Sequence, residues 1–444
     1  MSDAQPPSGL GPSPLAAGDS QISVADARAA IAAALRPITG DEDVPLAASG
    51  GRVLAADLVS PIDVPAHDNS AMDGYAFDGA ALREGEALVL SNVGHVFAGK
   101  PFAGSVGRGQ AVRIMTGAVM PDGLDTVVPF ELCNVEGDRV AIAPGTIRRG
   151  ENRRHRGEDL ARGQPALRQG RWLRPADVGL VASLGIERVR VKRRLRVALF
   201  STGDELRLPG EPLDAGCIYD SNRYTLAAAI QRLGMDVVDL GLVRDDRGAL
   251  QTVLNRAMAE ADVVVTSGGV SAGDADHVRE LMAQLGDVAF WKVAMRPGRP
   301  FAFGRLNGAT AAAAAVDAAG AADERRTASW LFALPGNPVA ALVTFYAFAR
   351  EALLHLAGAR SEPLPVLKAR SVSAIRKRPG RTEFQRGILT LAADGQWEVR
   401  IAGSQGAGIL RSMSEANALV VLRHEQASVA AGEAVEVWLF DGLV

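Results

Sequence analysis

The sequence has few of the residues that mark disulfide-rich, metal-cluster or membrane proteins. Its 444 residues include only two cysteines, Cys133 and Cys217, which are far apart and belong to no CxxC or Cys/His cluster. A disulfide framework or a zinc or iron–sulfur site is therefore not indicated, and the composition fits a reducing cytoplasm. The N-terminus has no signal-peptide pattern, and no stretch approaches about 18 uncharged apolar residues, since Arg350, Glu351 and His355 interrupt the apolar run at 339–356. No membrane partner is expected.

An excess of one charge is also missing. The 48 basic and 51 acidic residues give a net charge of -3, so a nucleic-acid partner is not expected. The short basic clusters at 148–156 and 376–381 have no interleaved aromatic residues, and we interpret them as solvated loops. The hydrophobic content of 48% supports a globular protein, and the length suggests roughly two to four domains.

Three common catalytic or nucleotide-binding motifs are absent as well. The sequence has no GxxxxGK[ST], no GxGxxG after a strand and no GxSxG. A P-loop NTPase, a dinucleotide-binding Rossmann site and a nucleophile elbow are therefore not supported. Serines near glycine-rich turns are accordingly expected to bind ligand and not to act as nucleophiles.

Patterns along the chain predict a multidomain protein with α/β and all-β parts. A helix is predicted at 23–35, capped by Ser23, and the segment 44–193 that follows has mainly short β-type pieces with one helix at 175–184. From Arg194 onward strands alternate with helices, among them one at 221–234 and a long one from Pro338, which predicts a doubly wound, mostly parallel sheet. Asn337 is expected to cap the long helix, with Pro338 in its first turn. The expected parts are a disordered tail at 1–20, a linking β/α domain at 21–60 and 160–193, a small β domain at 61–159, the α/β domain at 194–360, and a C-terminal β-barrel at 361–444.

One segment of the α/β domain looks foreign to it. Residues 307–327 are dominated by alanine and have no apolar face to bury. A mobile surface loop is the favoured interpretation and a frayed helix the alternative. The segment resembles an insertion in a hairpin, and folding over the site would change how substrate enters.

Polar turns follow the predicted strands at one edge of this sheet. They are STGDEL (201–206), RDD (244–246), TSGGVSAGDAD (266–276), RPGRP (296–300) and LPGNP (334–338). Ligands of doubly wound sheets bind beyond the carboxyl ends of the strands, so these turns are expected to converge. An ordinary βα turn with Asp274 as helix cap is the alternative for the SGG stretch. The predicted ligand-binding residues are Ser201, Thr202, Gly203, Thr266, Ser267, Gly268, Gly269 and Ser271.

Acidic and basic side chains accompany these turns. Glu205, Asp245 and Asp276 supply carboxylates that suit a hard cation such as Mg²⁺, and we predict them as its ligands. The cations are Lys292, Arg296 and Arg299, which suit phosphate or another oxyanion. Together they indicate a metal-assisted reaction of phosphate or an oxyanion.

A second polar cluster lies in the β half of the chain. The stretch DNSAMDGYA (68–76) gathers acids and amides around a glycine, and IMTGA (114–118) adds Thr116. Turn chemistry explains the polar residues one by one. It does not explain Met72, Tyr75 and Phe77 among them.

Two further motifs are GEDL (157–160) and WKVAMRPGRPFAFG (291–304). In their order along the chain, all these motifs resemble those of the molybdopterin molybdenumtransferases, a family that includes bacterial MoeA and the E domain of gephyrin. The resemblance covers nearly the whole chain from about residue 21. It implies a magnesium-dependent insertion of molybdate into adenylated molybdopterin with release of AMP, the final step of molybdenum cofactor biosynthesis. This chain differs from the family at Arg296 and Arg299, where family members often have lysine. The positive charge is kept, but the geometry of the hydrogen bonds changes.

The resemblance also implies residue roles and partners. Functional positions of the small β domain match Asp68, Thr116 and Asp159; acids around the pterin and metal match Glu205, Asp245 and Asp276; Lys292 and Arg296 match the basic positions; and the LPGNP residues Pro335, Gly336, Asn337 and Pro338 shape the pocket. A homodimer with a composite site is implied, with molybdopterin adenylyltransferase and downstream cofactor-handling proteins as partners.

Two other functions are alternatives. A molybdopterin adenylyltransferase resembles only the α/β domain, and a receptor-clustering scaffold like gephyrin uses a fused N-terminal domain. The additional β domains argue against the first, and the short stretch before the first helix argues against the second.

Overall fold

The computed structural model describes residues 21–270, 277–307, 328–360 and 364–440. The chain forms two compact units. The first unit contains the residues up to Glu42, the short piece Gly51–Ala55 and everything from Arg190 onward. The second unit contains Asp43–Gly50 and Ala56–Val189 and is thus inserted in the sequence of the first.

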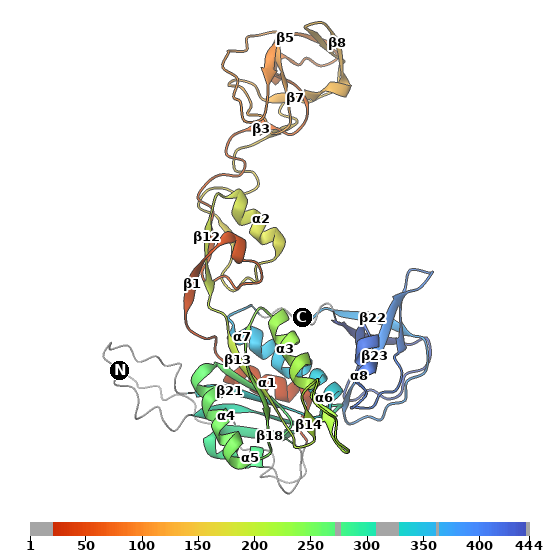
Figure 1. The fold of residues 1–444 in the computed structure, drawn as a ribbon. Helices are drawn as coiled ribbons and strands as arrows, with labels where there is room; N and C mark the ends of the chain where they lie inside the picture. Colours follow the sequence, from red (N-terminus) through yellow and green to blue (C-terminus); the bar gives the residue numbers. More distant parts are fainter. Residues whose placement is uncertain (1–20, 271–276, 308–327, 361–363, 441–444) are drawn as a thin grey trace, which may run out of the picture. The chain divides into compact units, whose positions relative to one another are not determined.

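A six-stranded sheet is the centre of the first unit (Figure 1). Its four neighbouring strands β16, β13, β17 and β21 are parallel, and β20 and β18 continue the sheet in antiparallel pairings. The predicted doubly wound, mostly parallel sheet is confirmed. Its strands are, in sheet order, β16 (Asp236–Val243), β13 (Arg196–Thr202), β17 (Val263–Ser267), β21 (Ala328–Leu334), β20 (Pro300–Asn307) and β18 (Gly286–Lys292).

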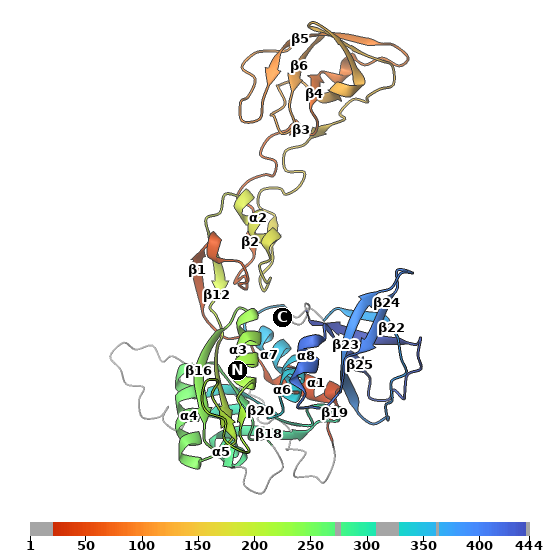
Figure 2. The ribbon, with the colours of Figure 1, turned by 45° about the vertical axis from the view of Figure 1, so that its right-hand side comes forward.

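Helices cover both faces of this sheet (Figures 1 and 2). On one face α4 (Arg247–Glu260) and α5 (His277–Leu285) form an apolar core with alternate strand residues such as Phe200 and Val264. The opposite face carries α3 (Asn222–Arg232), α6 (Pro338–Thr344) and, after a π-helical turn at Phe345–Ala349, α7 (Arg350–Leu356). Because both faces are buried, β17 is a continuous run of buried residues and not an alternating one.

The N-terminal helix α1 (Val24–Ala34) belongs to this unit. Ser23 accepts a hydrogen bond from the backbone N–H of Asp26, as the predicted cap requires. Ile22 forms a bridge with Val293, and the N–H of Ile38 donates to the carbonyl of Leu356. The helix is thereby attached to segments of the α/β domain that come much later in the sequence.

The run Pro338–Leu356 is, among the described residues, the helical stretch that is long and apolar enough to cross a membrane by length and composition. However, 78% of its most apolar stretch is buried inside the protein. Pro338 occupies the first helical turn as predicted. The predicted cap is wrong in one respect, because Asn337 holds the N-cap position but its side chain makes no capping hydrogen bond.

The alanine-rich segment is inserted in a hairpin, as the sequence suggested. Asn307 at the end of β20 pairs directly with Ala328 at the start of β21. Residues 308–327 themselves lie outside the described part of the chain, so their predicted loop or helix is not addressed. The segment leaves and re-enters the sheet at the amino end of β21, opposite the carboxyl edge where ligands are expected.

The C-terminal part of the first unit contains a closed five-stranded barrel, which confirms the predicted β-barrel. Five strands pair around its circumference, and β19 (Met295–Arg296) adds to β23 from outside. A core that includes Val399, Val420 and Val437 fills the barrel. The strands, with one short helix, are β22 (Val366–Ser371), β23 (Thr382–Leu391), β24 (Trp397–Ile401), β25 (Ala418–Leu422), β26 (Ala434–Leu439) and α8 (Leu410–Glu415).

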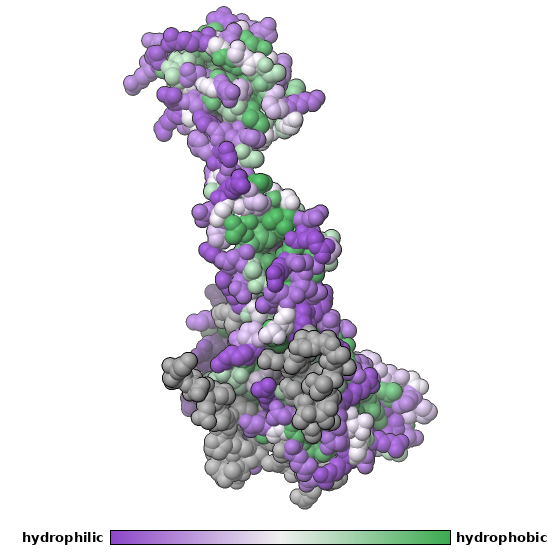
Figure 3. Space-filling view, turned by 90° about the vertical axis from the view of Figure 1, so that its left-hand side faces the viewer, coloured by the Kyte–Doolittle hydropathy of each residue, from purple (hydrophilic) through white to green (hydrophobic). Residues whose placement is uncertain are grey.

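The second unit is mainly β, as predicted for this half of the chain. A six-stranded sheet in the order β7-β4-β6-β5-β9-β8 carries two apolar cores. On the face shown in Figure 3 hydrophilic residues predominate, with apolar ones between them. The strands of the six-stranded sheet are β4 (Gly74–Phe77), β5 (Leu88–Val96), β6 (Gln110–Ile114), β7 (Thr126–Pro129), β8 (Cys133–Glu136) and β9 (Arg139–Ile142).

Short elements complete both units. The predicted helix at 175–184 is α2 (Pro175–Ser183). Two-stranded pairings join β1 (Asp41–Pro45) with β12 (Arg188–Lys192), β2 (Leu58–Val59) with β11 (Pro165–Leu167), β3 (Asn69–Ser70) with β10 (Arg153–Arg154), and β14 (Leu206–Arg207) with β15 (Ile218–Tyr219). Single 3₁₀ turns lie at Leu46–Ala48, Gly79–Ala81 and Phe130–Leu132.

Candidate active site

A cavity of about 810 Å³ lies at the carboxyl edge of the α/β sheet. Its walls are the turns after β13, β17 and β21, the start of α3, the turn at 296–300, and a loop at 405–410 from the C-terminal part of the unit. The predicted site residues that line it are Thr202, Gly203, Glu205, Asp245, Ser267, Gly268, Gly269, Arg296, Pro335, Gly336, Asn337 and Pro338.

Four predicted residues of the same unit are not among the described lining residues. One of them is Arg299, an exposed residue whose carbonyl accepts a hydrogen bond from the N–H of Val293 at 2.7 Å. The Ser201 hydroxyl donates to Asp220 at 3.1 Å in the interior, and the hydroxyl of Thr266 is buried without a hydrogen-bond partner among the described residues. Lys292 ends the edge strand β18 at the same side of the sheet. Ser271 and Asp276 lie outside the described residues.

Glycine is required at two points of the cavity wall. Gly268 has φ +96°, and a Cβ there would lie 2.5 Å from the carbonyl oxygen of Thr202. A Cβ on Gly203 would lie 2.6 Å from the Glu205 carboxylate. A side chain at position 268 would displace the backbone of Thr202, so the turns after β13 and β17 pack together because Gly268 is a glycine, whereas at Gly203 the exposed Glu205 side chain could move and the constraint comes from its φ of +153°.

The carboxylates on the wall are accessible. Glu205 and Asp245 are both exposed, and Asp245 accepts a hydrogen bond from the Thr202 hydroxyl at 3.0 Å. Arg296, also exposed, supplies positive charge from a separate turn. Among the described residues no group of three or more His, Cys, Asp or Glu is arranged to hold a metal ion. A second cavity of about 990 Å³ shares Gly203, Leu206 and Asp245 with the first.

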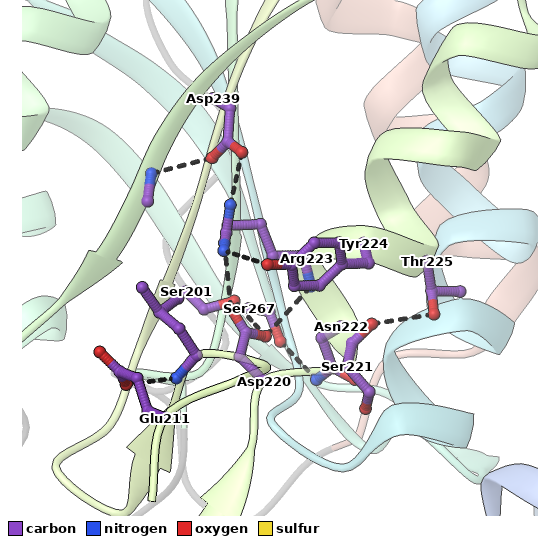
Figure 4. A network of polar contacts seen from close by, with 12 residues as sticks. Ser201, Glu211, Asp220, Ser221, Asn222, Arg223, Tyr224, Thr225, Asp239 and Ser267 are labelled. Atoms are coloured by element: carbon purple, nitrogen blue, oxygen red, sulfur yellow. Dashed lines mark hydrogen bonds and ion pairs between the residues drawn. The ribbon is translucent and has the colours of Figure 1, made fainter.

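A polar network underlies the cavity at the start of α3 (Figure 4). Asp220 accepts hydrogen bonds from Ser201 and from the backbone N–H and Nε of Arg223. The same guanidinium also forms an ion pair with Asp239. Burial opposes the charge of Arg223, but the two carboxylates outweigh it and raise the pKa of Arg223.

The loop at 404–408 is held by a buried arginine. Arg386 is 0% exposed and donates to the carbonyls of Ser404 and Gly406, each at 3.0 Å. Burial, followed by the charge of Arg296, lowers the pKa of Arg386 to about 10. The loop is joined to α6 as well, because the N–H of Val339 donates to the carbonyl of Ala407 at 3.0 Å.

The remaining predicted residues, Asp68, Thr116 and Asp159, lie in the second unit. Asp68 is bound by the Nε of Arg153 at 2.8 Å and by the backbone N–H of Arg156 at 2.7 Å. Burial opposes ionisation of Asp68, yet these donors prevail and lower its pKa.

Thr116 and Asp159 differ in their surroundings. Thr116 donates to Asp73, a residue of the DNSAMDGYA stretch that had no assigned role. The side chain of Asp159 is exposed.

Comparisons with known proteins cover most of the chain. Family models match the MoeA N-terminal region (domain I and II) over residues 22–185, a probable molybdopterin binding domain over 198–355, and the MoeA C-terminal region (domain IV) over 368–440. A molybdopterin molybdenumtransferase of Haemophilus influenzae is 39% identical over 407 residues, which is 91% of this chain and 95% of that protein. The chain belongs to the molybdopterin molybdenumtransferase family.

Other relatives are also similar to this chain over nearly its whole length. Molybdopterin molybdenumtransferase 2 of Mycobacterium tuberculosis is 36% identical over 414 residues, 91% of this chain and 95% of that protein. The crystal structure of the molybdopterin biosynthesis moeA protein of Pyrococcus horikoshii matches with a TM-score of 0.78 and 27% identity, over 95% of this chain and 100% of that one. The predicted enzyme class, a transferase, is therefore confirmed.

Sequence reasoning missed the residues that start α3. Asp220, Ser221 and Asn222 line the cavity, but the sequence suggested only a helix start there. The available signal was an aspartate, a serine and an asparagine in succession between a strand and a helix, at the same sheet edge as the predicted turns.

Proposed function

We propose that this chain inserts molybdenum from molybdate into adenylated molybdopterin in a magnesium-dependent reaction that releases AMP. The observation that carries the proposal is the cavity at the carboxyl edge of the sheet, which combines carboxylates, an arginine and glycine backbone in one wall. A pterin joined to AMP through a diphosphate needs all three kinds of group. A general molybdopterin-binding protein would not need carboxylates facing its anionic ligand.

The basic and backbone groups suit the anionic parts of the substrates. Arg296 is exposed in the cavity, and its planar guanidinium can donate two parallel hydrogen bonds to a phosphate or to molybdate. Gly268 and Gly269 both have positive φ and let a phosphate approach the backbone closely. These groups hold the substrate's diphosphate and the incoming oxyanion near each other.

The carboxylates fit a magnesium ion. Glu205 and Asp245 are exposed in the same wall, and Mg²⁺ is usually bound by one or two carboxylates together with water and substrate phosphates. Asp276, the third predicted ligand, lies outside the described residues. When bound, the ion would neutralise charge on the phosphates as AMP departs. The Thr202 hydroxyl, which donates to Asp245, keeps that carboxylate oriented in the wall.

The decisive experiment follows AMP directly. Purified protein is incubated with adenylated molybdopterin, Mg²⁺ and molybdate, and AMP release is measured together with activation of an apo-molybdoenzyme. We expect both signals to require molybdate and to disappear with EDTA. AMP release without molybdate, or cofactor transfer without AMP release, would contradict the proposed reaction.

The same assay distinguishes the proposed reaction from that of a molybdopterin adenylyltransferase. A molybdopterin adenylyltransferase would consume ATP and molybdopterin and form the adenylated compound. We expect no ATP consumption by this chain, and therefore place it after an adenylyltransferase, which would supply its substrate.

We also propose a homodimer with composite sites. Its support is that the predicted residues divide between the two units: Asp68, Thr116 and Asp159 belong to the second, and the cavity belongs to the first. In a two-fold dimer the second unit of one chain can complete the site of the other, which gives two equivalent sites.

A further inference from the structure

Asn222 joins two walls of the cavity. It is the first residue of α3 and is 8% exposed (Figure 4). Its Nδ2 donates to Oγ of Ser267, in the turn after β17, at 2.6 Å and to the carbonyl of Gly336, in the loop after β21, at 2.7 Å. One carboxamide therefore ties together segments that are far apart in the sequence.

The chemistry fixes the orientation of this amide. The carbonyl of Gly336 can only accept, so the nitrogen and not the oxygen of the amide must face it. The second proton of Nδ2 goes to Ser267, whose own hydroxyl donates to the carbonyl of Pro335 at 3.3 Å. One amide proton and the serine proton thus bind the loop at 335–336, and the other amide proton holds the serine hydroxyl that donates to the loop.

The loop has few other attachments at this point. Pro335 and Pro338 have no N–H to donate, and the side chain of Asn337 makes no capping bond to α6. The nearest backbone bond before the loop joins the N–H of Gly268 to the carbonyl of Leu334 at 3.0 Å. Among the described hydrogen bonds, the side-chain links to the middle of the loop are therefore the Asn222 amide at Gly336 and the longer bond from the Ser267 hydroxyl to Pro335.

We propose that Asn222 is a positioning residue for the substrate: its carboxamide sets the separation between the turn at 267–269 and the loop at 335–338, and thereby the width of the cavity that receives the pterin. The inference rests on the proposed function, in which this cavity binds molybdopterin. An asparagine suits the task because two donors on one rigid group hold two acceptors at a fixed angle. Asn222 itself takes no part in bond making or breaking.

The test uses a variant of similar shape with no donors, Asn222→Leu, in the full-length protein. The control is Thr225→Val, which removes the hydroxyl that donates to the carbonyl of Ser221 at 2.9 Å in the same helix and does not line the cavity. We expect Asn222→Leu to raise the Kd for molybdopterin and the KM for adenylated molybdopterin about tenfold, with kcat within about threefold of wild type, as loss of binding geometry predicts. Thr225→Val should leave all three within about twofold.

Hydrogen exchange supplies a readout that needs no ligand. In the free protein we expect faster amide exchange in the peptide spanning 334–340 for Asn222→Leu, with no change for Thr225→Val. Unchanged exchange and unchanged Kd, or equal effects in the two variants, would overturn the positioning role. If the wild type binds molybdopterin but releases no AMP, the proposed reaction fails while the Kd and exchange measurements still decide the role of Asn222.

Discussion

Thr116 donates two hydrogen bonds to a single oxygen of Asp73, one from its backbone N–H and one from its hydroxyl, each 2.7 Å long. The contact joins the two motifs of the second unit that the sequence had marked as functional. The backbone bond, followed by the hydroxyl bond, lowers the pKa of Asp73 below its ordinary value of 3.8.

This pair gives a prediction about pH. A carboxyl with a lowered pKa stabilises the fold above its unfolded pKa, and the stabilisation is lost as pH falls through the folded pKa. Thr116→Val keeps the backbone bond and loses the hydroxyl bond, so the pKa of Asp73 should move back toward 3.8. Thr116→Val should therefore be less stable than the wild type above the unfolded pKa, and the difference should shrink as pH falls through the pKa of Asp73. Thr116→Ser, which retains both donors, is the control; NMR titration of the Asp73 carboxyl and melting curves from neutral pH to below the pKa of Asp73 provide the measurements. An identical pKa in the two variants would show that the hydroxyl bond is unimportant.

Glu205 gives a prediction about the metal. Glu205→Gln removes one negative oxygen from the cavity wall, and we expect molybdate-dependent AMP release to fall at least about tenfold and to need more Mg²⁺. Because the residue is exposed, the free energy of unfolding should change by less than about 0.5 kcal/mol. Asp287→Asn, on an exposed position of β18, is the matched control. Near-normal turnover of the Gln variant at low Mg²⁺ would remove Glu205 from the site.

The hairpin of β20 and β21 gives a prediction about the insertion. Asn307 and Ala328 are directly paired, so residues 308–327 can be replaced by a two-residue Asn-Gly turn. Activity and melting temperature should stay nearly unchanged, because the junction lies at the amino end of β21, about 20 Å of strand away from the cavity edge. A large loss of either quantity would mean that the segment packs on the protein or reaches the site.

Mixed dimers test the composite site. Asp68→Ala and Glu205→Ala, each expected to be inactive alone, are unfolded, mixed and refolded together. Random pairing makes about half of the dimers mixed, and each mixed dimer holds one intact site, so about a quarter of wild-type activity should return. If mass measurements confirm mixed dimers and activity stays near zero, both acids belong to one chain's site.

The sequence predicted the parts of this site that depend on local chemistry. A valine run followed by two glycines specifies a buried strand and a tight turn, and β17 with Gly268 and Gly269 has that form. The role of Asn222 could not be predicted, because its partners Ser267 and Gly336 are 45 and 114 residues away. Asn337 has the right residue type for a cap but makes no capping bond.

The contribution of the C-terminal part was hidden for a similar reason. The sequence predicts a separate barrel after residue 361, and nothing in the stretch at 405–408 signals contact with α6. That contact depends on the backbone bond from Val339 to Ala407 and on the carbonyls held by Arg386. Backbone carbonyls are present at every residue, so a sequence pattern does not reveal which of them a buried arginine will bind.

The insertion of the second unit within the first has a consequence during translation. Helix α1 leaves the ribosome early, yet the bridge from Ile22 goes to Val293, which is 271 residues later (293 − 22). At about 5–20 residues per second, the helix waits roughly 15–50 s for this partner. Meanwhile the second unit, which has its own apolar cores, is synthesised completely. A nascent chain stalled near residue 200 thus carries a unit with its own cores next in sequence to a helix whose apolar residues Ala27 and Ile31 still lack the partners that bury them in the finished protein.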